Sequence, residues 1–105
     1  MKVLFDECVP RPLRGLLGSH AITTAQEMGW GRLENGELIR KSEESGFDAF
    51  VTGDQNLRYQ QNLAARRIAI LLLSTNYWPT LRDNKDSILA ALESLKPGEY
   101  REVLF

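Results

Sequence analysis

Three acidic residues, Asp6, Glu37 and Asp54, occupy positions from which carboxylates could act together on a phosphate ester. Asp6 follows the apolar run of residues 2–5, Asp54 follows the apolar run of residues 48–52, and Glu37 falls in the first turn of a predicted helix. Carboxylates that converge repel one another, and a hard divalent cation with oxygen ligands relieves that repulsion. Two such cations about 4 Å apart can stabilise both the attacking and the leaving oxygen of a phosphodiester displacement.

Structural roles are an alternative for each of these acids, because acidic residues are common at strand ends and helix starts. Asp54 suits an Asx turn that leads into a following helix. Glu37 in a first helical turn interacts favourably with the helix dipole without any further function. Asp6 could cap the helix that begins near Pro10, although it lies rather far upstream for that role.

The elements that must position the acids alternate between strand and helix patterns. The strand patterns cover residues 2–5, 20–24, 48–52, 67–74 and 100–104. The helix patterns cover residues 10–17, 36–45 with Asn35 as N-cap, 57–64 and 86–95, and residues 74–79 are predicted to form a loop. This alternation predicts an α/β fold, in which a mostly parallel sheet lies between two helical layers in a three-layer α/β/α sandwich. If the first strand lies between the second and third, Asp6 and Asp54 meet at the carboxyl edge of the sheet, where ligands bind.

Composition predicts one globular domain that spans residues 1–105, with a net charge of −1. That charge does not favour nucleic-acid binding by bulk attraction, so phosphate binding would need local arginines. We consider Arg11, Arg14 and Arg58 as such substrate-binding residues, from their positions alone. The single cysteine excludes an internal disulfide framework. A signal-peptide pattern and a long apolar run are not seen, so the expected location is the cytoplasm, without a membrane partner.

Four segments of the chain resemble the PIN-like domains in their order and in the elements that carry them. The closest resemblance is to the compact bacterial PIN-like group that is often classed with toxin components of toxin–antitoxin pairs. The segments are VLFDECVPRPL, ENGELIRKSEESG, VTGDQNLRYQQNL and RIAILLL. The resemblance spans nearly the whole chain and implies a parallel sheet covered by helices.

The active members of this superfamily are metal-dependent ribonucleases, and their acidic residues match Asp6, Glu37 and Asp54 in this chain. The resemblance thus implies that these three side chains are catalytic and bind Mg²⁺ or Mn²⁺. Glu7 lies beside the first position and is a further candidate for the metal site. Asn56 stands where many relatives carry another acid, and its amide oxygen can ligate a metal but brings no charge.

The implied function is endonucleolytic hydrolysis of RNA phosphodiester bonds by a metal-activated water. The implied partners are an RNA substrate, an antitoxin protein and a second copy in a homodimer. The uncharged Asn56 keeps a second reading open, in which the chain is a catalytically inactive PIN-like binding or regulatory module. A phosphatase that uses the same acids is a third possibility.

Other residues that could serve chemistry have more common structural roles. Trp30 and Trp78 are predicted in loops, where they could stack on unpaired bases, but such residues more often pack over the sheet edge or contact a partner chain. Cys8 lies close to the acids, and a lone cysteine beside a strand is usually a small core residue. His20 is predicted to start the second strand as a half-buried residue.

Overall fold

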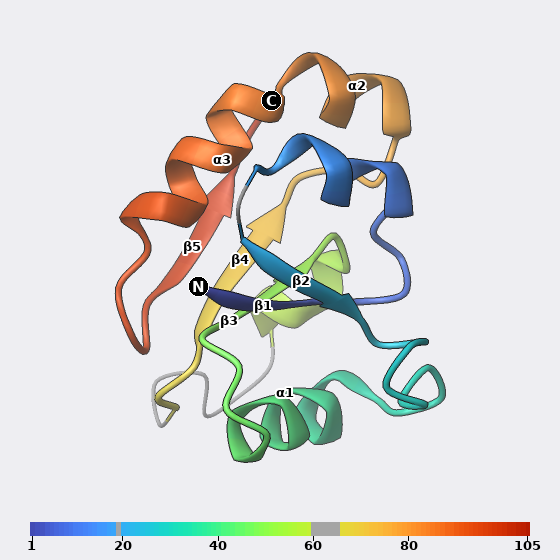
Figure 1. Cartoon of the computed structure of the whole chain (residues 1–105), viewed down its shortest axis with the longest axis vertical. Coiled ribbons are helices and arrows are strands. Elements are labelled where there is room, and N and C mark those ends of the chain that lie inside the picture. The colour runs from blue at the N-terminus through green and yellow to red at the C-terminus, as the bar shows by residue number, and fades with distance from the viewer. Residues whose placement is uncertain (19, 60–65) are drawn as a thin grey trace.

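The computed structural model shows an α/β fold, in which a sheet of five parallel strands has helices on both faces (Figure 1). The structure describes residues 1–18, 20–59 and 66–105, without the side chains of residues 58 and 59. The strands are β1 (Lys2–Phe5), β2 (Ala21–Thr24), β3 (Ala49–Thr52), β4 (Ala69–Leu73) and β5 (Tyr100–Val103). The helical elements are the 3₁₀ helices η1 (Arg11–Leu16) and η2 (Gln55–Tyr59) and the α-helices α1 (Asn35–Glu44), α2 (Trp78–Asp83) and α3 (Lys85–Ser94).

The strand order is β2-β1-β3-β4-β5, so the first strand lies between the second and the third as the sequence predicts. All four strand pairs are parallel, and Phe5 of β1 is opposite Val51 of β3. Each residue of β3 and β4 is buried, as expected for strands that are covered on both faces. The carboxyl ends of β1 and β3 therefore lie side by side at one edge of the sheet.

Two separate apolar clusters confirm the predicted three-layer arrangement. Side chains on one face of the sheet, including Val3 and Val51, pack with Leu13 of η1, Leu81 of α2 and Leu92 of α3. On the other face, residues that include Leu4, Phe50 and Ile70 pack with Leu38 and Ile39 of α1 and Leu57 of η2. Figure 1 shows α1 on one side of the sheet and α2 and α3 on the other.

The start of α1 differs from its prediction. The N-cap is Glu34 rather than Asn35, and no side chain caps the helix by a hydrogen bond. Asn35 already belongs to the first turn, and its side-chain amide donates to the carboxylate of Asp54. The helix ends as predicted near Gly46, whose φ of +83° suits a glycine after a helix.

Two further helix boundaries also differ. Helix α2 begins at Trp78, within the stretch predicted as a loop, because Pro79 is tolerated in a first helical turn and Leu81 is buried beneath it. Helix η2 begins at Gln55, two positions before the predicted start, and residues 60–64 of that prediction lie outside the described residues. Among the described residues, no helix has the length and apolar character needed to cross a membrane.

Candidate functional site

A cleft of about 620 Å³ opens at the carboxyl ends of β1 and β3, where the sequence predicts the acids to meet. It is lined by Asp6, Glu7, Cys8, Leu33, Glu34, Asn35, Gly53, Asp54, Gln55, Asn56 and Asn76. Among these described lining residues, four are acidic and none is Lys or Arg. Walls of one charge sign focus the electrostatic potential, so the described lining of this cleft favours cations over phosphates.

Asp6 continues β1 beyond its last residue and is only 8% exposed. Its backbone N–H donates to the carbonyl oxygen of Val51 at 2.9 Å, which fixes its position against β3. Its carboxylate accepts hydrogen bonds from the backbone N–H of Glu7 at 2.8 Å and from the hydroxyl of Thr52 at 2.7 Å. These donors satisfy a charge that would otherwise be costly to bury.

Thr52, the last residue of β3, joins the two candidate aspartates. Its buried hydroxyl donates to Oδ2 of Asp6 and accepts a hydrogen bond of 3.1 Å from the backbone N–H of Asp54. One hydroxyl has one proton to donate and lone pairs to accept, so both bonds form together. The ends of β1 and β3 are thus held in a fixed relation at the cleft.

Asp54 has the Asx-turn geometry that the sequence allows as its structural role. Its Oδ1 accepts a hydrogen bond of 3.0 Å from the backbone N–H of Asn56. Its Oδ2 accepts one of 2.7 Å from the side-chain amide of Asn35, which joins the start of α1 to the end of β3. Each oxygen retains lone pairs for a ligand, because a carboxylate accepts about four hydrogen bonds.

Glu37 does not line the cleft. Its carboxylate forms an ion pair of 2.6 Å with Arg40, one turn further along α1. Glu34, which precedes α1, lines the cleft instead and was not singled out from the sequence. Within the described part of the chain, no three His, Cys, Asp or Glu side chains gather closely enough to hold a metal ion by themselves. The structure therefore brings together Asp6, Glu7, Asp54 and Asn56 and leaves Glu37 outside.

Cys8 supports Asp6 from inside the cleft. Its Sγ lies 3.4 Å from Oδ2 of Asp6 and 3.6 Å from the hydroxyl of Thr52. Burial, followed by the negative charge of Asp6, raises the pKa of this thiol above its ordinary value. The protonated thiol is the form that can donate to a carboxylate, so Cys8 acts here as a weak neutral donor.

Two amides join the ends of β3 and β4 beside the acids. Gln55 donates to the carbonyl oxygens of Leu73 at 2.7 Å and of Gly53 at 3.1 Å. Asn76 donates to the carbonyl oxygen of Gly53 at 3.5 Å and lies so close that a Cβ at Gly53 would clash with its Oδ1. Asn76 was also missed from the sequence, although it follows a parallel strand at the same sheet edge.

Two of the three candidate phosphate-binding arginines, Arg11 and Arg14, are not among the described residues that line the cleft. Arg11 is exposed on η1. Arg14 forms an ion pair of 2.7 Å with Glu27 beside β2. Arg58 belongs to η2, and its side chain lies outside the described part of the structure.

The two tryptophans pack within the fold. Trp30 contacts Phe47 edge to face, with ring centroids 6.3 Å apart. Trp78 is half-buried against the core cluster beneath α2. Tyr77, the residue before Trp78, is 65% exposed and follows Asn76 of the cleft. Among the described residues, Tyr77 thus offers an accessible aromatic ring next in sequence to a residue that lines the cleft.

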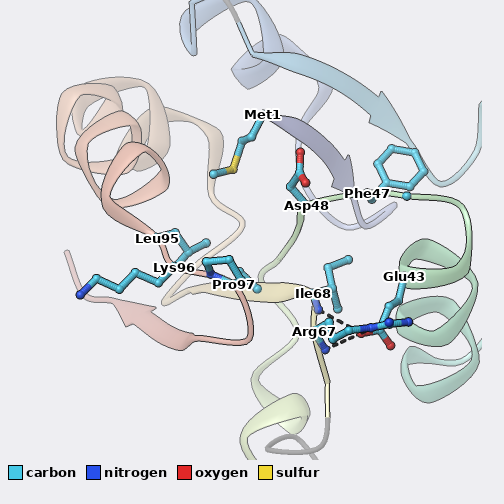
Figure 2. A pocket seen from close by; sticks show the side chains of 11 residues that line it. Met1, Glu43, Phe47, Asp48, Arg67, Ile68, Leu95, Lys96 and Pro97 are labelled. Carbon is cyan, nitrogen blue, oxygen red and sulfur yellow. Dashed lines mark hydrogen bonds and ion pairs between the residues drawn. The ribbon is translucent and has the colours of Figure 1, made fainter.

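A second cavity, of about 330 Å³, lies at the opposite edge of the sheet, where the strands begin (Figure 2). Its wall includes Met1, Phe47, Leu95 and Pro97, which are apolar. Figure 2 shows that Glu43 points to the start of β4, where the backbone N–H groups of residues 67 and 68 donate to its carboxylate. That carboxylate holds the chain in place, so the acidic cleft is the stronger candidate for chemistry.

Comparisons with known proteins do not extend this description. No protein-family model matches the chain, and neither a curated protein nor a solved structure matches it significantly. The site must therefore be interpreted from its own geometry and from the sequence resemblance.

Proposed function

We propose that this protein is a PIN-like, metal-dependent endoribonuclease that works in the acidic cleft. The observation that supports this proposal best is the pairing of Asp6 and Asp54 at the ends of adjacent parallel strands, with Thr52 bonded to both. The parallel sheet with helices on both faces, and Asp6 and Asp54 at its carboxyl edge, support the proposal, whereas Glu37, the third acid that the resemblance implies, lies outside the cleft.

The donor set of the cleft suits Mg²⁺ or Mn²⁺, because it consists of carboxylate and amide oxygens. Asp6 and Asp54 would hold the ion, because Mg²⁺ is usually bound by one or two carboxylates and keeps several waters. Glu7, Glu34 and Asn56 line the cleft around that position. A bound divalent cation supplies an acidified water and positive charge beside the scissile phosphate. It would also offset the four carboxylates, which otherwise repel an RNA backbone.

The chain itself would orient both ion and substrate. Thr52 and the Glu7 N–H hold the Asp6 carboxylate in one orientation, so little reorganisation is needed when a ligand binds. The exposed ring of Tyr77, next in sequence to the cleft residue Asn76, could stack on an unpaired base. Arg11 remains a candidate for a more distant phosphate. By the same resemblance, we propose that the protein acts as a toxin with an antitoxin partner and forms a homodimer.

A non-catalytic binding module is the second candidate, and specific contacts favour it. Glu37 is engaged by Arg40, and Asp54 accepts hydrogen bonds at both oxygens from Asn35 and Asn56. In this reading the acids and amides hold the loops in place, and the cleft surface recognises a partner.

Cleavage of a labelled single-stranded RNA separates the two candidates. The purified protein should cleave it with Mg²⁺ or Mn²⁺, and cleavage should stop with EDTA and in Asp6→Asn and Asp54→Asn. Asp83→Asn is the matched control, because it changes an exposed aspartate on α2 outside the cleft. If the wild-type protein is inert with both ions, the proposed activity is excluded. If cleavage survives in both cleft variants, the cleft is excluded as the active site. Phosphate monoesters assayed in parallel test the phosphatase alternative.

A further inference from the structure

Side chains occupy two of the main-chain groups on the outer edge of β2. The backbone N–H groups of Ala21 and Ala25 donate to Met1 and Phe5 at 3.1 and 2.8 Å, so odd-numbered residues here face β1. Successive residues of a strand direct their main-chain groups to opposite sides. The carbonyl of Ile22 and the N–H of Thr24 therefore point away from the sheet, where a further strand could bind.

Arg14 and Glu27 occupy those two outward groups. The guanidinium of Arg14 donates to the carbonyl oxygen of Ile22 at 3.4 Å. The carboxylate of Glu27 accepts a hydrogen bond of 2.9 Å from the backbone N–H of Thr24. The backbone N–H of Glu27 donates to the Thr24 hydroxyl at 3.1 Å. Arg14 and Glu27 are joined by an ion pair of 2.7 Å. A donor on one outward carbonyl and an acceptor on the N–H two residues later is the pattern that one residue of a parallel strand provides.

The side chains of β2 give the edge no other protection by charge. Its sequence, AITT, has no charged residue and three β-branched residues, which favour strand pairing. Natural edge strands are commonly protected from pairing by charges or covering groups. Here the charged groups come from η1 and from the turn after β2.

We propose that the Arg14–Glu27 pair closes the outer edge of β2 against strand addition. Without the pair, the edge becomes a self-association site, and the occupant is β2 of a second copy. The same uncharged strand is present on each copy, so pairing about a two-fold axis satisfies both edges at once. The Arg14–Glu27 ion pair prevents strand pairing at this edge, so a native homodimer of this protein would use a different surface.

The test uses the double variant Arg14→Ala/Glu27→Ala, followed by light scattering during gel filtration over a wide concentration range. We expect a mass that rises with concentration to at least twice that of the wild type at equal loading. The control is Arg82→Ala/Asp83→Ala, which removes an exposed ion pair on α2, and it should behave as the wild type does.

Amide exchange by NMR locates the contact. In the variant, the Thr24 amide should exchange faster than in the wild type when dilute and should regain protection as the protein associates. The amides of Ala21 and Ala25 should stay protected throughout, because β1 still holds them. A folded variant with the mass of the wild type at all concentrations overturns the proposal, as does association without renewed protection of Thr24. If the double variant does not fold, the single variant Glu27→Ala, which removes the acceptor of the Thr24 N–H, is judged by the same two outcomes.

Discussion

The hydroxyl of Thr52 donates a hydrogen bond of 2.7 Å to Oδ2 of Asp6, across 46 positions of the chain. Both residues are buried, and both stand at the end of a parallel strand. The same hydroxyl accepts from the N–H of Asp54. The position of one candidate ligand therefore depends on the other through a single side chain.

Thr52→Val should lower stability and disturb the cleft together. The valine preserves the shape of the strand but leaves a buried carboxylate oxygen and a backbone N–H without the hydroxyl. Loss of a partner for a buried polar group costs about 1–3 kcal/mol. Urea unfolding should show that loss in the free energy of unfolding, and metal binding to the variant should weaken. Thr52→Ser keeps the hydroxyl and should recover most of both properties, so equal behaviour of the two variants would contradict this account.

Divalent metal should stabilise the folded protein if the cleft binds it. A ligand present at about one hundred times its Kd adds roughly 2.7 kcal/mol to the free energy of unfolding. Thermal unfolding with Mn²⁺ or Mg²⁺ should therefore give a higher Tm than with EDTA, and Asp6→Asn should abolish the increase. Glu34→Gln should reduce the increase more than Glu37→Gln does, because Glu34 lines the cleft while Glu37 pairs with Arg40. If Glu37→Gln reduces the increase in Tm more than Glu34→Gln does, Glu37 is a metal ligand after all.

The sequence was sufficient to predict the sheet and the location of its two aspartates. Apolar runs and β-branched residues predicted all five strands near their observed positions, and alternation with helices predicted parallel pairing. Once β1 and β3 are neighbours, Asp6 and Asp54 must share an edge, whatever the side chains around them do. This part of the site follows from topology alone.

The rest of the site depends on helix phase and long-range contacts, which a sequence pattern does not specify. A shift of one or two residues at a helix start rotates its side chains by 100° or more, at about 100° per residue. With Glu34 as N-cap, it is this residue and Asn35 that face the cleft, and Glu37 turns toward Arg40. The contacts of Asn76 with Gly53 likewise join segments 23 positions apart.

Gly53→Ala should have opposite effects on stability in two backgrounds. In the wild type, the new Cβ would clash with Oδ1 of Asn76, so the asparagine must leave its position and lose its hydrogen bond to the carbonyl of residue 53. We expect a lower free energy of unfolding there. In Asn76→Ala the space is free, and a glycine-to-alanine change without strain stabilises by about 0.4–1 kcal/mol through the unfolded chain. Urea unfolding of the four proteins measures this, and equal effects in both backgrounds would exclude the contact.

Protonation of Glu27 at low pH should make the outer edge of β2 available for strand pairing. Its pKa is lowered, first by the hydrogen bond from the Thr24 backbone and then by Arg14, the one charged group that contributes to the shift. A folded-state pKa below the unfolded value means that the stabilisation is present above the unfolded pKa and is lost as pH falls through the folded pKa. The edge should therefore stay closed at neutral pH and open only below the ordinary range of a glutamate.

The Thr24 amide resonance should report this transition, because its N–H loses a charged acceptor when Glu27 is protonated. We expect its chemical shift to titrate with a midpoint below the ordinary glutamate value, and the mass from light scattering to begin to rise over the same range. Glu27→Gln cannot titrate and should show neither change in that window. Arg14→Ala retains the carboxylate but removes the second cause of the shift, so its midpoint should move upward. If Glu27→Gln shows the same pH profile as the wild type, another group causes the acid response, and protonation of Glu27 does not open the edge of β2.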